Sequence, residues 1–415
     1  MQQQPLTPAV RRAVRSWPHL HKLQRTRGFA GFNCWYASRR YFSPALSTSH
    51  ILFNAGTKSG RTHRFLPMKF LSRLHAQVRS CWQGTPLPAD KITTAPIFHP
   101  LYEFDETRGR WCPVEPIRPT ASAFDSDNMS TSQDAQALNL VTWNVDYSSP
   151  LPVARFSAIV SRILGLTPAV DIIFLQEVSP EALSSMFRNP TLRKGWVLSD
   201  PDRSLPAGQP FTTVTLLSKA RFRQENPTEL LKGEALGPVW RVAYPSRYGR
   251  DALCCDIFIP TSPASPPARV RLINVHLDSL PVQPSRRPQQ ISIVADLLRS
   301  AGRGLIAGDF NPVLPEDDAL IRDNGLVDGW VELHPEEPGF TWGNDGKQPF
   351  PPSRLDKIAV VGVELQSIEI LDPGSIARSS PDAAQTHGKE HAVEESIPWS
   401  DHCGLRCSFK LVGMD

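Results

Sequence analysis

The stretch Leu305-Ile-Ala-Gly-Asp309-Phe-Asn311 joins a short apolar run to two polar residues. Such a run is typical of a buried β-strand, and the polar residues mark the loop that follows it. The same transition occurs in Leu140-Val-Thr-Trp-Asn144-Val-Asp146, Ile172-Ile-Phe-Leu-Gln176-Glu177 and Leu272-Ile-Asn-Val-His276-Leu-Asp-Ser279. A fifth polar segment, Trp399-Ser-Asp401-His402, stands just before the final predicted strand. A single ending of this kind predicts only a turn. Five endings rich in Asn, Asp, Glu and His predict a shared site.

The wider pattern from residue 138 onward alternates strands and helices. The predicted strands are Leu140–Val145, Ile172–Leu175, Thr213–Leu217, Leu253–Ile259, Val270–Val275, Leu305–Ala307, Lys357–Val361 and Leu405–Leu411. Apolar residues at helical spacing predict one helix around Val153–Leu164 and another around Ile291–Leu298. Pro260–Pro267 predicts a hairpin loop, and Pro281–Pro288 a surface loop that enters a helix. We therefore predict an α/β domain with mixed sheets over residues 138–415.

The polar strand ends indicate a metal site. Ligand sites in α/β proteins collect beyond the carboxyl ends of strands, where loops present polar groups from a rigid base. No thiolate accompanies the predicted cluster, and Mg²⁺ prefers oxygen ligands, usually one or two carboxylates plus water and substrate phosphate. Glu177 is the predicted anchoring ligand and Asp401 the second, with Mg²⁺ as the ion and Mn²⁺ as a substitute.

The other strand-end residues suit the hydrolysis of a phosphoester. Asp309 is predicted to take a proton from water. Asn311 and Asn144, which do not ionise, are predicted to orient that water and the carboxylates. His276 and His402 are predicted to donate hydrogen bonds to phosphate oxygens as negative charge accumulates.

Asp356, in Arg354-Leu-Asp356-Lys-Ile, has two interpretations of equal weight. Its carboxylate can hold His402 in one tautomer and favour the charged imidazole. Alternatively, it forms an ion pair with Arg354 at the edge of a strand.

The first 89 residues are strongly basic. They contain fourteen Lys or Arg and no Asp or Glu, whereas residues 90–415 carry 31 basic and 41 acidic side chains. This head is a nucleic-acid-binding arm, an over-extended reading frame that really starts at Met68, or a mitochondrial presequence. We favour the presequence, with a processing site in Arg39-Arg-Tyr-Phe-Ser43.

Residues 90–137 are rich in Pro, Ser, Thr and Asp and are expected to form an arm or linker. The aromatic residues Phe98, Tyr102, Phe104 and Trp111 predict that this arm packs across the domain surface. The seven cysteines show no pairing pattern, and no apolar run is long enough for a membrane span. We expect an intracellular protein, located in the mitochondrion if the presequence is real and otherwise in the nucleus. The oligomeric state is not predicted.

The strand endings, in this order, resemble the endonuclease/exonuclease/phosphatase superfamily of magnesium-dependent phosphodiesterases, which includes DNase I. The resemblance covers residues 138–412 and rests on Thr142-Trp-Asn-Val-Asp146, Phe174-Leu-Gln-Glu-Val178, Val275-His-Leu-Asp-Ser279, Gly308-Asp-Phe-Asn311, Arg354-Leu-Asp-Lys-Ile358 and Ser400-Asp-His-Cys-Gly-Leu405. It implies a four-layer sandwich of two mixed β-sheets packed face to face, with helices outside. It also implies a site at one edge of the sandwich.

Within the superfamily the chain is most similar to the tyrosyl-DNA phosphodiesterase 2 branch. The resemblance implies substrate contacts by Arg250, Trp342, Ser279 and Arg287, with Arg250 and Trp342 lining a slot for a tyrosyl adduct on a DNA end. Core packing is the alternative for Trp342, and a solvated helix start is the alternative for Arg287. The chain departs from the branch at Pro210-Phe-Thr212, where a tyrosine is usual.

Three functions are therefore compared. The first is a Mg²⁺-dependent phosphodiesterase that removes 5′-tyrosyl adducts from DNA ends in repair. The second is the same fold acting on another phosphoester, namely an RNA 3′ end, abasic DNA or a phosphoinositide. The third is a catalytically inactive binding scaffold, which the complete set of polar strand ends disfavours. Because the body is acidic, DNA binding would depend on a local basic strip and the metal.

Overall fold

The computed structural model describes residues 95–114, 137–200, 209–222, 234–261, 267–348, 350–378 and 395–412. Chain contacts separate residues 1–88 and 282–284 from a second unit, residues 89–281 and 285–415, which contains both large sheets. The predicted presequence lies outside the described residues. Within the described part, no helix combines the length and apolar composition needed to cross a bilayer.

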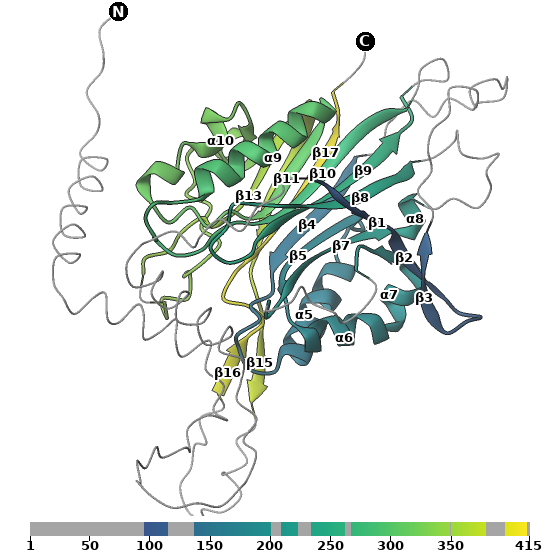
Figure 1. Cartoon of the computed structure of the whole chain (residues 1–415). Coiled ribbons are helices and arrows are strands. Elements are labelled where there is room, and N and C mark those ends of the chain that lie inside the picture. The colour runs from purple at the N-terminus through teal and green to yellow at the C-terminus, as the bar shows by residue number, and fades with distance from the viewer. Residues whose placement is uncertain are drawn as a thin grey trace, which may run out of the picture. The chain divides into compact units, whose positions relative to one another are not determined.

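Two large mixed sheets form the centre of this second unit (Figure 1). In spatial order the seven-stranded sheet contains β1 (Ile97–His99), β8 (Ala235–Ala243), β9 (Asp251–Ile259), β10 (Ala268–His276), β11 (Gly304–Asp309), β13 (Asp356–Val361) and β12 (Val327–Asp328). The eight-stranded sheet contains β14 (Val363–Leu371), β17 (Gly404–Leu411), β4 (Leu138–Asn144), β5 (Ile172–Val178), β7 (Thr212–Ser218), β6 (Trp196–Leu198), β2 (Leu101–Asp105) and β3 (Arg110–Val114). A separate hairpin pairs β15 (Ser375–Arg378) with β16 (Glu395–Pro398).

Helices cover the outer faces of both sheets. They are α5 (Pro152–Leu164), α6 (Pro180–Arg188), α7 (Pro190–Gly195), α8 (Lys219–Phe222), α9 (Arg287–Ala301), the 3₁₀ turn η3 (Pro315–Asp317), α10 (Leu320–Asp323) and α11 (Gly329–Leu333). Figure 1 shows α5, α6 and α7 on one side of the sheets and α9 and α10 on the other. The predicted α/β four-layer sandwich is confirmed.

The alternation of side chains along each strand divides the core into three apolar clusters. On β4, Leu138 and Leu140 face the seven-stranded sheet and form part of the central core, whereas Val141 and Trp143 face α5 and α6. A third cluster packs α9 against the outer face of the seven-stranded sheet. Of the predicted stripe, α5 buries Phe156, Val160 and Ile163, and it adds Ile159, whereas Val153 is exposed.

The N-terminal segment that was expected to form an arm or linker instead adds strands to both sheets. β1 extends the seven-stranded sheet beside β8, and β2 and β3 form the edge of the eight-stranded sheet. Trp111 of β3 packs against Phe104 and Phe187, so these aromatic rings belong to the packed unit. Residues 115–136 lie outside the described part of the chain.

Candidate active site

Parallel strand pairs bring the polar strand ends together at one edge of the sandwich. β10 and β11 run parallel with His276 opposite Asp309, and β4 and β5 run parallel with Asn144 opposite Gln176. The carboxyl ends of parallel neighbours lie at the same edge of a sheet, which is why these polar residues collect. Gly308 makes the β10–β11 approach feasible, because an added Cβ would lie 2.0 Å from the Val275 carbonyl oxygen.

A buried amide network joins the two sheets beneath these ends. The Gln176 Nε2 donates to Asn274 Oδ1 at 2.9 Å and to Thr142 Oγ1 at 3.0 Å. Asn274 in turn donates to the Val214 carbonyl at 3.0 Å. The network connects β4, β5 and β7 of one sheet with β10 of the other, and so fixes the ends of the two sheets relative to each other.

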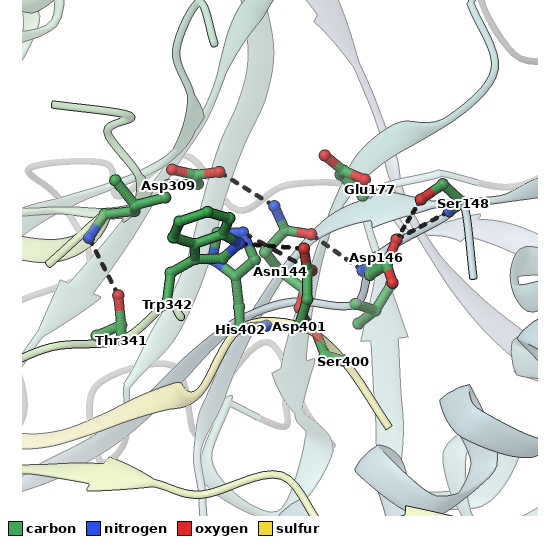
Figure 2. Close-up of polar contacts among 12 residues, drawn as sticks. Asn144, Asp146, Ser148, Glu177, Asp309, Thr341, Trp342, Ser400, Asp401 and His402 are labelled. Carbon is green, nitrogen blue, oxygen red and sulfur yellow. Dashed lines mark hydrogen bonds and ion pairs between the residues drawn. The ribbon is translucent and has the colours of Figure 1, made fainter. Parts of the chain in front are cut away.

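Asp309 connects several members of the cluster, and Figure 2 shows its contact with Asn144. Its Oδ2 accepts a hydrogen bond from Asn144 Nδ2 at 3.1 Å and lies 3.5 Å from His276 Nε2. His276 Nε2 is also 3.8 Å from Glu177 Oε1. The other Asp309 oxygen accepts from the Asn311 backbone amide at 2.9 Å. The structure thus brings together five of the predicted residues from four strand ends.

Left-handed backbone conformations turn three of the strand ends into the site. Asp146, Glu177 and Asn311 have φ values of 50°, 58° and 47°, which cost free energy in residues other than glycine. At Glu177 the pairing of β5 with β7 is also irregular between Leu175 and Val178. In a regular strand the side chain of Glu177 would point to the opposite face of the sheet from that of Gln176, which lies between the two sheets. The irregular turn instead brings its carboxylate within 3.8 Å of His276.

His402 is held by Asp356 from the neighbouring sheet. Its Nδ1 lies 2.8 Å from Asp356 Oδ2, and the same oxygen accepts a hydrogen bond from Thr341 Oγ1 at 2.7 Å. Arg354 forms its ion pair with Asp328 at 2.7 Å. Of the two interpretations of Asp356, the structure therefore favours the one in which its carboxylate orients His402.

The buried acidic groups in the site interact unfavourably with one another. Burial raises the pKa of Asp309 to about 7, and the carboxylates of Asp356 and Glu177 add to the rise against the opposing charge of His402. Burial likewise raises the pKa of Glu177, and Asp146 and Asp401 raise it further, although Arg250 and His402 act in the opposite direction. Several carboxylates thus share one buried region with the positive charges of Arg250 and His402.

The two histidines differ in charge state. Burial holds the pKa of His276 well below its usual value, helped by the positive charges of Arg250 and His402, so this imidazole is neutral. Burial also opposes the charging of His402, but the carboxylates of Asp356, Asp401 and Asp309 outweigh it and raise the pKa well above its usual value. Among the described residues, neither ring nitrogen of His276 has a hydrogen-bond partner. Both nitrogens are also buried, and Nε2 faces the carboxylates of Asp309 and Glu177.

A family model described as "Endonuclease/Exonuclease/phosphatase family" matches residues 141–402. This stretch contains all of the site residues described above. The chain belongs to the endonuclease/exonuclease/phosphatase family. The predicted membership is confirmed, and the match includes every candidate site residue from Asn144 to His402.

Solved structures of this family share the fold at low sequence identity. A zebrafish (D. rerio) TDP2 bound to a single-stranded DNA product is 21% identical, with 67% of this chain and 100% of that chain covered at a TM-score of 0.47. A TDP2 from C. elegans is 20% identical over 68% and 76% of the two chains, with a TM-score of 0.46. The human Nocturnin catalytic domain with bound sulfate is 16% identical over 68% and 96%, also with a TM-score of 0.46. No curated protein matches the sequence.

The predicted aromatic slot is arranged differently from the expectation. Arg250 does not lie over Trp342; its guanidinium lies 4.6 Å from the ring centre of Phe211. Phe211 also stacks on His276, with ring centres 5.6 Å apart, and lies 4.6 Å from Tyr147. The residue that replaces the usual tyrosine thus lines the site itself. The sequence feature that could have identified Phe211 as a site residue is its position just before β7.

Trp342 lies beside Asp401 and His402. Its indole Nε1 donates to Asp401 Oδ2 at 3.1 Å, as Figure 2 shows, and its backbone pairs with His402 and Ser353. These polar contacts place Trp342 beside the candidate metal ligand Asp401, and none of the three apolar clusters of the core includes it.

Arg287 is placed outside the site. Its side chain is fully buried, forms an ion pair with Asp317 at 2.8 Å and donates to the carbonyls of Asp278 and Leu280. These contacts give it a structural role in the loop after β10. Ser279 lies half-buried in the same loop, and its contact with substrate stays a prediction.

The fit to a divalent cation depends on the carboxylates. In the part of the chain that the structure describes, no group of three His, Cys, Asp or Glu side chains is closed around a metal position. Mg²⁺ does not need one, because it usually binds one or two carboxylates with water and phosphate. Glu177, whose side chain is 16% exposed, is destabilised by Asp146 and Asp401. These clustered hard-oxygen donors fit a divalent cation.

Proposed function

We propose that this chain is a Mg²⁺-dependent phosphodiesterase that hydrolyses phosphoester bonds at DNA ends, with 5′-tyrosyl adducts as the substrate and DNA repair as the process. One observation carries the proposal: Asp309 lies within 3.1 Å of Asn144 and 3.5 Å of His276 in a buried cluster built from both sheets. A binding scaffold would have no need to maintain such repulsion among buried carboxylates.

Asp309 is the proton acceptor in this mechanism. Asn144 and the Asn311 amide hold its two oxygens, so the carboxylate faces a fixed direction. A group with a pKa near the working pH is the most effective general base, and burial moves that of Asp309 toward neutrality. Asp309 therefore takes a proton from the attacking water.

The two histidines have separate tasks. Because Nδ1 of His402 is bound to Asp356, Nε2 is the nitrogen that can donate to a non-bridging phosphate oxygen. His402 is positively charged and compensates the charge that develops on that oxygen. Neutral His276 supplies a second donor from the opposite wall, next to Asp309.

Glu177 would hold the Mg²⁺, with Asp401 as the second candidate ligand. When bound, the ion would supply charge compensation for the phosphate and for the leaving oxygen. Mn²⁺, with the same preference for carboxylate oxygens, is expected to replace it.

Support for an aromatic leaving group comes from the walls of the site. Phe211 contacts Tyr147 and Arg250 and stacks on His276, and Trp342 lies next to Asp401. Aromatic rings and an arginine are physically suited to contact a tyrosyl ring.

A panel of oligonucleotides carrying 5′-tyrosyl, 3′-tyrosyl, abasic and RNA 3′-overhang ends tests the proposal. We expect the 5′-tyrosyl substrate to be cleaved fastest with Mg²⁺ and cleavage to stop with EDTA. Faster cleavage of another member would reassign the substrate, and cleavage in EDTA would refute the metal.

Glu177→Ala is expected to reduce the apparent affinity for Mg²⁺ by at least about tenfold, because the anchoring carboxylate is lost. Titrating Mg²⁺ against activity should show partial rescue at high concentration. The matched control is Glu181→Ala, since Glu181 is an exposed carboxylate in the first turn of α6. Identical Mg²⁺ curves for Glu177→Ala and the wild type would remove Glu177 as the ligand.

Trp342→Ala is expected to slow release of tyrosine about three- to tenfold more than hydrolysis of a small chromogenic phosphodiester, because only the former offers an aromatic ring to contact. Trp342→Phe keeps the ring but loses the hydrogen bond to Asp401. It should retain the preference for the tyrosyl substrate. Equal losses on both substrates would show that Trp342 acts only through Asp401.

A further inference from the structure

Arg155 lies in the first turn of α5 and is fully buried. All five N–H groups of its guanidinium donate to backbone carbonyl oxygens. The acceptors are Pro150 at 2.8 Å, Val145 at 3.0 Å, Ser149 at 3.1 Å, and the closely approached Asp146 and Trp399. A buried arginine with every donor matched to a carbonyl is a structural fork between the segments that supply those carbonyls.

The two segments carry candidate site residues. Residues 145–150 follow Asn144 and include Asp146, and Trp399 precedes Asp401 and His402 in the chain. They are far apart in sequence, and Arg155 contacts both at once. Its Nη1 donates to Val145 on one side and Trp399 on the other.

Smaller contacts connect the same two segments. Ser400 Oγ donates to the Asn144 carbonyl at 2.6 Å and accepts from the His402 amide at 3.0 Å. The Trp143 indole donates to the His402 carbonyl at 3.0 Å. Arg155 differs from these in its number of bonds and in carrying a charge, which lies 4.0 Å from the Asp146 carboxylate.

We propose that Arg155 is a positioning residue that fixes the loop after β4 against the loop before β17, and that this bracing sets the affinity of the site for a divalent cation. The inference rests on the proposed metal-dependent function. Residues that orient a metal ligand typically change metal affinity or activity 10- to 100-fold when they are replaced. The effect of Arg155 is transmitted through the backbone around Asp146 and Asp401.

The sharpest variant is Arg155→Lys, because it keeps the positive charge and removes the fork. A lysine offers three donors from one nitrogen and cannot reach carbonyls on both sides in the same way. Any change in metal binding is then due to positioning, since the charge is unchanged. The matched control is Arg271→Lys, which breaks a bidentate ion pair with Asp256. Arg271 precedes His276 by five residues on β10 and so lies roughly 16 Å from it along the strand.

Binding of Mn²⁺ to the metal-free full chain is measured by electron paramagnetic resonance, without substrate. We expect Arg155→Lys to bind Mn²⁺ about tenfold more weakly than the wild type, and Arg271→Lys to bind it as the wild type does. Wild-type affinity in Arg155→Lys would overturn the inference. An equal loss in Arg271→Lys would also overturn it, because the effect would then be general destabilisation.

Glu177→Ala separates this inference from the proposed function. If the wild type binds Mn²⁺ no better than Glu177→Ala, the proposed metal site itself fails. If Glu177→Ala loses binding but Arg155→Lys does not, only the role of Arg155 fails.

Amide hydrogen exchange provides a second measurement that does not depend on the metal. In Arg155→Lys, peptides covering residues 145–150 and 399–402 should both exchange faster than in the wild type, whereas those of β10 should not. Ser400→Ala, which removes one smaller link, should show the same change to a lesser extent. Unchanged exchange in both loops would contradict the positioning role.

Discussion

Replacing Asp309 with asparagine is expected to lower turnover about a hundredfold or more while the protein stays folded. Asparagine has nearly the same shape and can still accept the hydrogen bond from the Asn311 amide. It cannot take a proton from water, so only the chemical step is lost. Single-turnover cleavage of the substrate chosen by the oligonucleotide panel measures the effect, with Mn²⁺ binding as the check on the metal site.

The stability of this variant has a predicted sign as well. The pKa of Asp309 is raised from about 3.8 to about 7 by burial, so the folded state prefers the protonated carboxyl. The stability that Asp309 contributes is therefore present at a pH below its pKa in the unfolded chain, and it is lost as the pH rises through its pKa in the folded protein. Asparagine does not titrate, so thermal unfolding under alkaline conditions in EDTA should show that Asp309→Asn is at least as stable as the wild type. A turnover near that of the wild type would contradict the assignment of Asp309 as the base.

Arg287→Met is expected to lower the free energy of unfolding by about 3–5 kcal/mol, because Asp317 would be left as a buried charge without its partner. That is a large share of the stability of an ordinary domain. Denaturant unfolding followed by fluorescence measures it. If Arg287 instead contacted substrate, as the family resemblance implied, the variant would keep its stability and show a raised KM.

The double variant Arg287→Met/Asp317→Leu provides the control for this prediction. Removing both charges eliminates the unpaired carboxylate, and such replacements are often neutral or stabilising. Recovery of most of the lost free energy is the expected result. A double variant as unstable as Arg287→Met would show that the ion pair is not the cause.

The sandwich could be predicted because its strands are short apolar runs and its two long helices have clear helical spacing. α5 illustrates this, since Phe156, Val160 and Ile163 of the predicted stripe are buried. The edge strands β1 to β3 could not be predicted in the same way. They lie in a segment whose overall composition is polar and proline-rich, and their order comes from pairing with β8 and β6.

Much of the polar cluster could be predicted because Asn144, Glu177, His276 and Asp309 lie at the ends of apolar strands. Parallel pairing then places His276 opposite Asp309 without any further information from the chain. The sequence does not decide the partner of Asp356, since both His402 and Arg354 fit the pattern. Only the three-dimensional arrangement provides Arg354 with a different partner, Asp328.

Contacts that form only in the tertiary structure account for what the sequence could not predict. Arg155 is followed by the buried stripe of α5 and resembles any charged helix residue in the sequence. It is buried because five backbone carbonyls accept hydrogen bonds from its guanidinium, and no sequence pattern predicts this arrangement. Arg287 acquires its structural role from Asp317, which is 30 positions away.

The most direct test of a single hydrolytic centre shared by both sheets is a double-mutant cycle between Asn144, in the eight-stranded sheet, and Asp309, in the seven-stranded sheet. Turnover of the best substrate is measured for Asn144→Ala, Asp309→Asn and the double variant. Because the two side chains share a hydrogen bond, we predict that the double variant is little slower than Asp309→Asn alone. Losses that simply multiply would contradict a common centre, as would a double variant with turnover near that of the wild type.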